Sequence, residues 1–248
     1  MELSDNLNLW EESYDWSRQG EEWSQAWGGS EAQWFGCVFP RIHRFLPAGT
    51  ILEIAPGFGR WTRFLAGLCS QYVGVDLSAR CVEFCQRRFA RQSTCEFHVN
   101  DGKSLDFIAD GSVDFAFSFD SLVHAEADVL ESYVEQFARK LQPDGAGFIH
   151  HSNCGEYADE VVAGSVGNQH ARALSVTALR FAECCERNRL CCVSQEIVNW
   201  GQAELIDCFS TLVPAGSKWA RPGVVLRNPE LMAEAELIKR IAPSYSSR

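Results

Sequence analysis

The chain has 248 residues, a length that suits one α/β domain with elaborations. Hydrophobic residues make up 46% of it, which is ample for a packed core. The formal net charge of −11 disfavours a DNA or RNA substrate, because an acidic surface repels nucleic-acid phosphates.

The sequence has no apolar run long enough to span a bilayer, and its first residues lack the basic and apolar regions of a signal peptide. We therefore expect a cytoplasmic protein without a membrane span. Disulfides are rare in that compartment, so the eleven cysteines are expected to be reduced thiols.

Residues 1–36 are acidic and unusually rich in tryptophan, with Trp10, Trp16, Trp23, Trp27 and Trp34. One interpretation is a helical segment that packs its aromatic rings on the domain. The other is a lid over cofactor and substrate, with Gly28-Gly29 as hinge, since tryptophan faces attract cations. We predict a helical lid over residues 1–44 and a main domain over residues 45–248.

The stretch Ile51-Leu-Glu-Ile-Ala-Pro-Gly-Phe-Gly-Arg60 predicts a buried strand, a glycine-containing turn and a helix that opens at about residues 60–61. Gly57 and Gly59 lack a Cβ, so the backbone can turn sharply and approach a ligand. The following helix points its free N–H groups into the turn. This arrangement is the nucleotide-binding half of a Rossmann-like unit.

Two further predicted strands each end in an acid. Residues 71–76 end at Asp76, about where an acid after the second strand meets ribose hydroxyls, and residues 95–101 end at Asp101. A helix over residues 78–90 is predicted between them, with Ser78 as its N-cap.

This order of motifs resembles the class I S-adenosylmethionine-dependent methyltransferases over roughly residues 45–150. Their first motif is an acid followed by a Gly-x-Gly-x-Gly-like turn. Here Ala55 stands at the first glycine position and Pro56 follows it, which makes the turn stiffer. The resemblance implies a Rossmann-like α/β fold with a seven-stranded, mostly parallel sheet and helices on both faces.

The resemblance also implies S-adenosylmethionine as the cofactor. Asp76 would bind the ribose, Asp101 would face the adenine amine, and the turn at residues 55–59 would pass under the methionine part. The implied cofactor-binding residues are Glu53, Ala55, Gly57, Gly59, Arg60, Asp76, Leu77, Asp101, Gly102 and Phe119. An NAD-dependent dehydrogenase is the alternative within this fold, but residues 60–62 and 141–145 are more typical of methyltransferases.

A fourth strand is predicted over residues 113–119 and a fifth over residues 145–153. Ligands bind beyond the carboxyl ends of such strands, which places Asp120, His124, His150 and His151 near the reaction zone. Adjacent strand residues point to opposite faces, so only one of the last two faces substrate, and we favour His151. A histidine suits deprotonation of a hydroxyl. We predict His151 as the base, His124 as the second candidate and Asp120 as the orienting acid.

The alternative for these histidines is structural: His124 caps a helix and His150 is buried in the core. Residues 154–175 are predicted to be a substrate-recognition insertion. Within it, His170 and Arg172 are candidate substrate ligands, Arg172 for an anionic group, although both also suit a solvated loop. Trp27 is the candidate substrate contact in the lid.

The remaining elements complete the domain. We predict a helix over residues 176–188, a strand over 191–198, a last antiparallel strand over 204–213 and a closing helix over 228–241. The adjacent pairs Cys184-Cys185 and Cys191-Cys192 do not match zinc-ligand spacing, so no metal is expected.

Residues 118–124 and 148–153 are similar to bacterial methyltransferases of surface glycans and natural-product sugars. This similarity implies O-methylation of a sugar hydroxyl or another small-molecule, natural-product acceptor. One alternative is a methyltransferase of secondary metabolism that acts on a carboxylate, phenol or amine. Another is a regulatory protein that binds the cofactor without turnover. The oligomeric state stays open.

Overall fold

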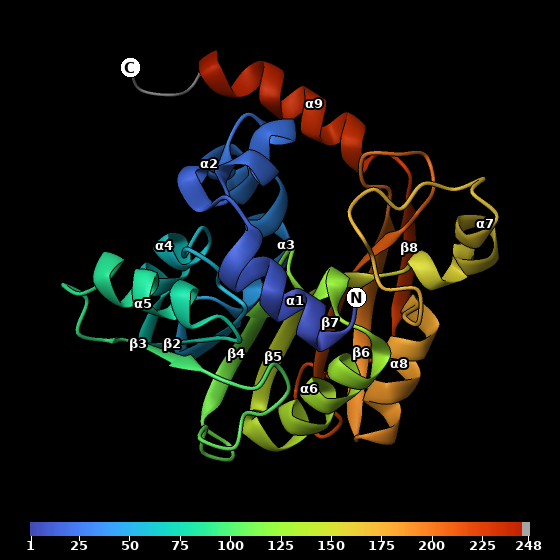
Figure 1. Ribbon diagram of the computed structural model, residues 1–248. Helices are drawn as coiled ribbons and strands as arrows, with labels where there is room; N and C mark the ends of the chain where they lie inside the picture. The colour runs from blue at the N-terminus through green and yellow to red at the C-terminus, as the bar shows by residue number, and fades with distance from the viewer. Residues whose placement is uncertain (245–248) are drawn as a thin grey trace.

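The computed structural model describes residues 1–244 of the chain, and its centre is one mixed β-sheet with helices on both faces (Figure 1). The strands are β1 (Ala48–Ile54), β2 (Cys69–Asp76), β3 (Cys95–Val99), β4 (Val113–Ser118), β5 (Leu141–Ser152), β6 (Leu190–Val198), β7 (Asp207–Pro214) and β8 (Val224–Asn228). The predicted class, a Rossmann-like and mostly parallel α/β fold, is confirmed.

The spatial order of the strands is β3-β2-β1-β4-β5-β7-β6-β8, and only β7 runs antiparallel to its neighbours. The order reverses between β1 and β4, because β1 pairs with β2 on one side and with β4 on the other. In open α/β sheets such a reversal leaves a crevice at the carboxyl ends of the strands. This geometry locates the candidate site.

The predicted count of seven strands is wrong, because β8 adds an eighth strand at the edge of the sheet. β8 pairs in parallel with β6 through Ser194 and Val224. Its residues Val224, Val225 and Leu226 are all more than half exposed. The segment therefore lacks the alternation of buried and exposed residues by which a strand is recognised in a sequence.

One face of the sheet is covered by the first third of the chain. Its helices are α2 (Ser30–Gln33), α3 (Phe39–Ile42), α4 (Thr62–Leu65) and α5 (Ala79–Arg88), and α9 (Leu231–Ile241) packs across α2, while α1 (Leu3–Asn8) lies over the ends of the strands. Ser78 caps α5 as predicted, since its Oγ accepts a hydrogen bond from the Cys81 N–H at 3.1 Å. α4 is a single turn that continues as a 3₁₀ turn, Ala66–Leu68.

The opposite face is covered by α6 (Ala127–Lys140) and α8 (Ala178–Arg187). α6 buries Val129, Tyr133 and Phe137 along one side. The short helix α7 (Ala158–Val162) lies in the segment that follows β5. None of the helices in residues 1–244 is long and apolar enough to cross a membrane.

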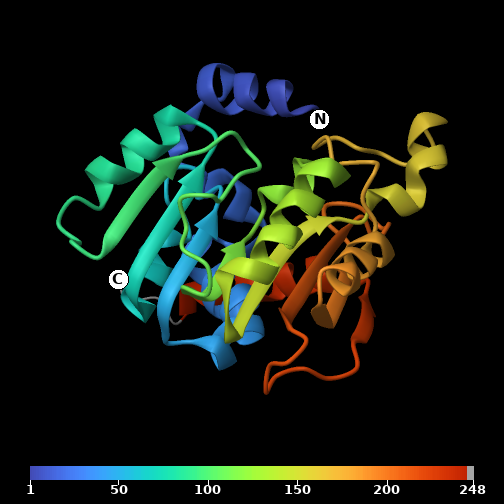
Figure 2. The ribbon, with the colours of Figure 1, turned by 90° about the horizontal axis from the view of Figure 1, so that it is seen from below.

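The N-terminal segment, residues 1–44, begins with α1, which runs across the carboxyl ends of the strands (Figure 2). α1 continues as a π-helical turn, Leu9–Ser13, and Glu11 in that turn accepts hydrogen bonds from Ser78 Oγ and the Arg80 N–H at 2.6 and 3.1 Å. Further along, Trp27, Trp34, Cys37, Val38 and Ile42 share one hydrophobic core with β1 and β4. The later part of the segment predicted as a lid is therefore packed into the main domain.

Candidate active site

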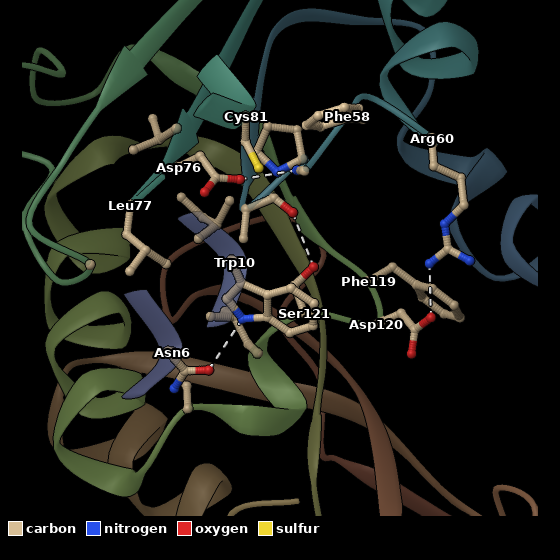
Figure 3. Close-up of a pocket in the computed structure, with 18 of the residues that line it drawn as sticks. Asn6, Trp10, Phe58, Arg60, Asp76, Leu77, Cys81, Phe119, Asp120 and Ser121 are labelled. Atoms are coloured by element: carbon tan, nitrogen blue, oxygen red, sulfur yellow. Dashed lines mark hydrogen bonds and ion pairs between the residues drawn. The ribbon is translucent and has the colours of Figure 1, made fainter. Parts of the chain in front are cut away.

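A pocket lies at the carboxyl ends of β1, β2 and β4, beside the reversal in strand order (Figure 3). The space between its walls is about 880 Å³ when the part that opens to solvent is included. The residues after these strands line it together with the N-terminal segment, which contributes Leu3, Asn6, Trp10, Trp16, Gln19 and Trp23. From the sequence, these tryptophans were predicted either to pack on the domain or to form a lid over cofactor and substrate.

The turn after β1 forms the floor of the pocket. Ala55 and Gly57 both have φ of +57°, a left-handed conformation that is uncommon for alanine. Gly57 also faces Trp16, and a Cβ on it would lie 2.9 Å from the Trp16 ring. Gly59 does not line the pocket, because it packs against Phe89 on the other side, where a Cβ would lie 2.6 Å from that ring.

Asp76, at the end of β2, ties the turn to the next helix. Its carboxylate accepts hydrogen bonds from the Gly57 N–H at 3.0 Å and the Ser78 N–H at 2.9 Å. It lines the pocket with Leu77, and burial raises its pKa to about 6. Two carboxylate oxygens offer more acceptor positions than these bonds use, so Asp76 can also receive hydroxyl groups of a ligand.

Two of the acids predicted to bind the cofactor do not line the pocket. Glu53 is buried beneath the turn, where it accepts hydrogen bonds from Tyr72 and from Thr62 Oγ1, and burial raises its pKa to about 7. Asp101 is exposed, and its carboxylate accepts hydrogen bonds from its own turn. β3 ends at Val99, earlier than predicted, so Gly102 reaches the pocket in place of Asp101.

The other end of the pocket is built around an ion pair. Asp120, directly after β4 and Phe119, binds Arg60 at 2.8 Å, and Figure 3 shows the two side chains pointing toward each other. Arg60 also donates to Ser24 Oγ at 2.9 Å. Its guanidinium lies 4.5 Å from the Trp61 ring centroid and 5.2 Å from that of Trp23. The result is an aromatic-walled compartment with one cation and one carboxylate.

The structure corrects the prediction that His151 is the catalytic base. His151 is fully buried on the face covered by α8, where its ring stacks on Phe181 at 4.2 Å. Its Nδ1 lies 2.8 Å from the Ser152 carbonyl oxygen and its Nε2 lies 2.8 Å from Ser210 Oγ. Burial lowers its pKa to about 4. The ring therefore has no free nitrogen and no contact with the pocket.

The second histidine, His124, is also kept from the pocket. It stands beside Trp10, with ring centroids 5.7 Å apart, and its Nδ1 lies 3.3 Å from the Ala171 carbonyl oxygen. Burial lowers its pKa to about 4. Of the three residues predicted to be catalytic, only Asp120 lines the pocket.

His150 is the histidine that contacts the site through Asp120, although His151 was the predicted base. Its Nδ1 accepts a hydrogen bond from the Asp120 N–H at 3.1 Å, and its Nε2 lies 3.1 Å from Asp207 Oδ2. The alternation argument was sound, but the choice of face depends on how β5 pairs with β4 and β7, which sequence spacing does not reveal.

The predicted substrate residues lie outside the pocket. Trp27 is buried in the core against Trp200, with ring centroids 5.1 Å apart. Arg172 is buried and makes two hydrogen bonds to Asp207, at 3.0 and 2.8 Å, so it is not free to clamp an anion. His170 is exposed. Within residues 1–244, no cluster of three or more His, Cys, Asp or Glu side chains is arranged to hold a metal ion.

Comparison with known proteins identifies the class of this fold. Residues 51–145 match the model of a methyltransferase domain family. That stretch runs from β1 into β5 and contains the turn, Asp76 and Asp120. No curated protein matches the chain.

Several solved structures share the fold. The PH0226 protein of Pyrococcus horikoshii is 18% identical with a TM-score of 0.57, over 86% of this chain and 99% of that one. An S-adenosylmethionine-dependent methyltransferase of Clostridium acetobutylicum is 13% identical with a TM-score of 0.59, over 82% and 96%. A complex of DhpI with SAH is 20% identical with a TM-score of 0.54, over 89% and 95%. The architecture is thus the class I methyltransferase fold.

The methyltransferase-domain match supports S-adenosylmethionine as the cofactor, and the residues present fit that molecule. Asp76 provides a buried carboxylate of the kind that accepts ribose hydroxyls, and Ala55 and Gly57 of the turn line the pocket beside it. Leu77 and Cys81 offer apolar walls for a purine ring. The faces of Trp10 and Trp16 suit a sulfonium cation.

Proposed function

We propose that this protein is an S-adenosylmethionine-dependent methyltransferase that methylates a small-molecule acceptor. The observation that carries the proposal is a single pocket with two chemically different ends. One end has the glycine turn and Asp76, and the other has the aromatic walls, Arg60 and Asp120. The cofactor, when bound, supplies an electrophilic methyl group.

The chain's own residues would align the acceptor and exclude water, and alignment alone accounts for much of the acceleration in such displacements. Trp23 and Trp61 provide flat walls for a ring-shaped acceptor. The Trp61 indole N–H is buried and has no hydrogen-bond partner within residues 1–244. A buried donor without a partner is costly, which supports an acceptor that brings an oxygen atom to it.

We therefore propose O-methylation of a hydroxyl, on a sugar or on another natural-product ring. Asp120 is the carboxylate at this end of the pocket and would receive the hydroxyl proton, the role for which the histidines were predicted. The buried Arg60 cation supports a second candidate, an acceptor that also carries a carboxylate, because a guanidinium binds such groups with two parallel hydrogen bonds.

We also propose that the first part of the N-terminal segment, residues 1–26, opens to admit ligands. It lies over the pocket and is held there by contacts of Glu11 with the start of α5 and by Trp16, which stacks on Phe58 at 4.4 Å. Residues from Trp27 onward are packed in the core and would stay in place.

The test begins with calorimetric titration of the protein with S-adenosylmethionine and S-adenosylhomocysteine, with NAD as control. We expect binding of the first two and none of NAD. Release of S-adenosylhomocysteine is then measured with sugars, phenols, carboxylic acids and amines as acceptors. NAD binding in place of the methyl donor would overturn the proposal, and tight cofactor binding without turnover on any acceptor would favour a regulatory protein.

A further inference from the structure

A buried chain of polar groups stands behind Asp120 and extends away from the pocket. It runs from Asp120 through His150 and Asp207 to Arg172, and the last three side chains are at most 4% exposed. The residues come from four separate parts of the chain: the end of β4, β5, the start of β7 and the loop before α8. So large a set of buried polar groups beside a pocket calls for a physical explanation.

Asp120 has a backbone φ of +66°, in the left-handed region that residues with a side chain seldom adopt. Its neighbours hold it there from several sides. His150 Nδ1 accepts its N–H, Arg60 binds its carboxylate, and the next residue, Ser121, donates from Oγ to the Ala55 carbonyl oxygen at 3.0 Å. Without His150 the Asp120 N–H would lose its partner in a buried setting.

The hydrogen bonds also decide which nitrogen of His150 carries the proton. Nδ1 faces an N–H donor, so it must be the acceptor, and Nε2 then carries the proton and donates to Asp207. Burial by itself would raise the pKa of Asp207, but Arg172 and His150 hold it well below its usual range. The carboxylate of Asp207 therefore stays charged and keeps the His150 proton on Nε2.

We infer that His150 is a positioning residue, which holds Asp120 in the strained backbone conformation that presents its carboxylate to Arg60 and the pocket. Asp207 fixes the tautomer and orientation of His150, and Arg172 keeps Asp207 in place. In its contribution to turnover the inference rests on the proposed methyl transfer, while its structural part is independent of any activity.

Two conservative variants separate positioning from simple packing. His150→Asn places a carbonyl oxygen near the position of Nδ1, so it can still accept the Asp120 N–H. His150→Gln places its polar end near Nε2, so it can still contact Asp207 but leaves the Asp120 N–H without a partner. His150→Phe keeps the ring volume and removes both contacts. His98→Phe, at a half-exposed position on β3 away from the pocket, is the matched control.

The first readout is structural. In the ¹⁵N-labelled protein we expect a coupling across the hydrogen bond between the Asp120 nitrogen and His150 Nδ1, with His98→Phe unchanged. The Asp120 amide should keep its position in the spectrum of His150→Asn and shift in those of His150→Gln and His150→Phe. Absence of the coupling in the wild-type protein would overturn the inference, whether or not the protein proves to be a methyltransferase.

The second readout is turnover with the acceptor found in the screen described above. We expect His150→Phe and His150→Gln to lower kcat roughly 100-fold, the scale of a misplaced reacting group, with unchanged affinity for S-adenosylhomocysteine. His150→Asn should recover most of the rate. Recovery by His150→Gln instead of His150→Asn would show that the Asp207 contact alone matters. Thermal unfolding of each variant confirms that it is folded.

Discussion

Asp76 accepts hydrogen bonds from the glycine turn and from the start of α5, and it lines the pocket. We expect Asp76→Ala to weaken S-adenosylmethionine binding about 10- to 100-fold, the equivalent of one or two hydrogen bonds to a charged group. Asp101→Ala is the control, because the structure places that acid at the surface. Calorimetry measures both, and equal affinities for the wild-type protein and Asp76→Ala would remove Asp76 from the site.

The second prediction at the scale of one residue concerns the buried carboxyl group of Glu53. Burial raises its pKa to about 7 from an ordinary value of 4.5. The folded state then binds more protons than the unfolded state between these values, so this residue's contribution to the free energy of unfolding is largest below about pH 4.5. That contribution declines by about 3 kcal/mol as the pH rises to about 7.

Urea unfolding of the wild-type protein and of Glu53→Gln at several pH values isolates this effect. The buried His124 and His151, whose pKa values are lowered to about 4, act in the opposite direction, since their stabilisation is lost as the pH falls below 6.5. The difference between the two proteins cancels the histidines. A difference that does not vary between pH 4.5 and 7 would contradict the assignment to Glu53.

At the scale of an element, the N-terminal segment is the part of the site that we expect to move. Arg18 is exposed within it and follows Trp16, which packs on the turn. Bound S-adenosylhomocysteine would add contacts under the segment and shift it toward the closed position. We therefore expect slower tryptic cleavage after Arg18 when this ligand is present, followed by mass spectrometry.

Cleavage after exposed Arg91 provides the control, because that residue lies in the loop between α5 and β3, away from the pocket. Equal protection at both sites would indicate general stabilisation. No protection at Arg18 at saturating ligand would argue against a segment that closes on the cofactor.

At the scale of the whole molecule, all eleven cysteines are free thiols in the structure, and seven of them are buried. We expect eleven thiols to react with a thiol reagent in denaturant without added reductant. In the native protein, the four partly exposed cysteines should react first, because burial raises the pKa of Cys81, Cys85 and Cys208 and suppresses their thiolate forms. Fewer than eleven thiols in denaturant would reveal disulfides.

The sequence by itself determined the local units of this protein and their order. The apolar run at residues 51–54, the glycine turn and the strand that ends at Asp76 are short-range patterns, because strand, turn and cap preferences act over a few residues. The Rossmann-like class of fold follows from those units, and S-adenosylmethionine as the cofactor follows from the methyltransferase resemblance that they carry. The exposed edge strand β8 could not be predicted from the sequence, because it has no buried face to create a pattern of apolar residues.

Only the tertiary structure decided which polar residues share the pocket. A shift of one position along β5 exchanges His150 for His151 between opposite faces of the sheet, and pairing with β4 and β7 makes that choice. Arg172 meets Asp207 across 35 residues, and Arg60 meets Asp120 across 60. Such contacts depend on how elements pack, so the acids and histidines that look alike in the sequence acquire different roles only in the folded chain.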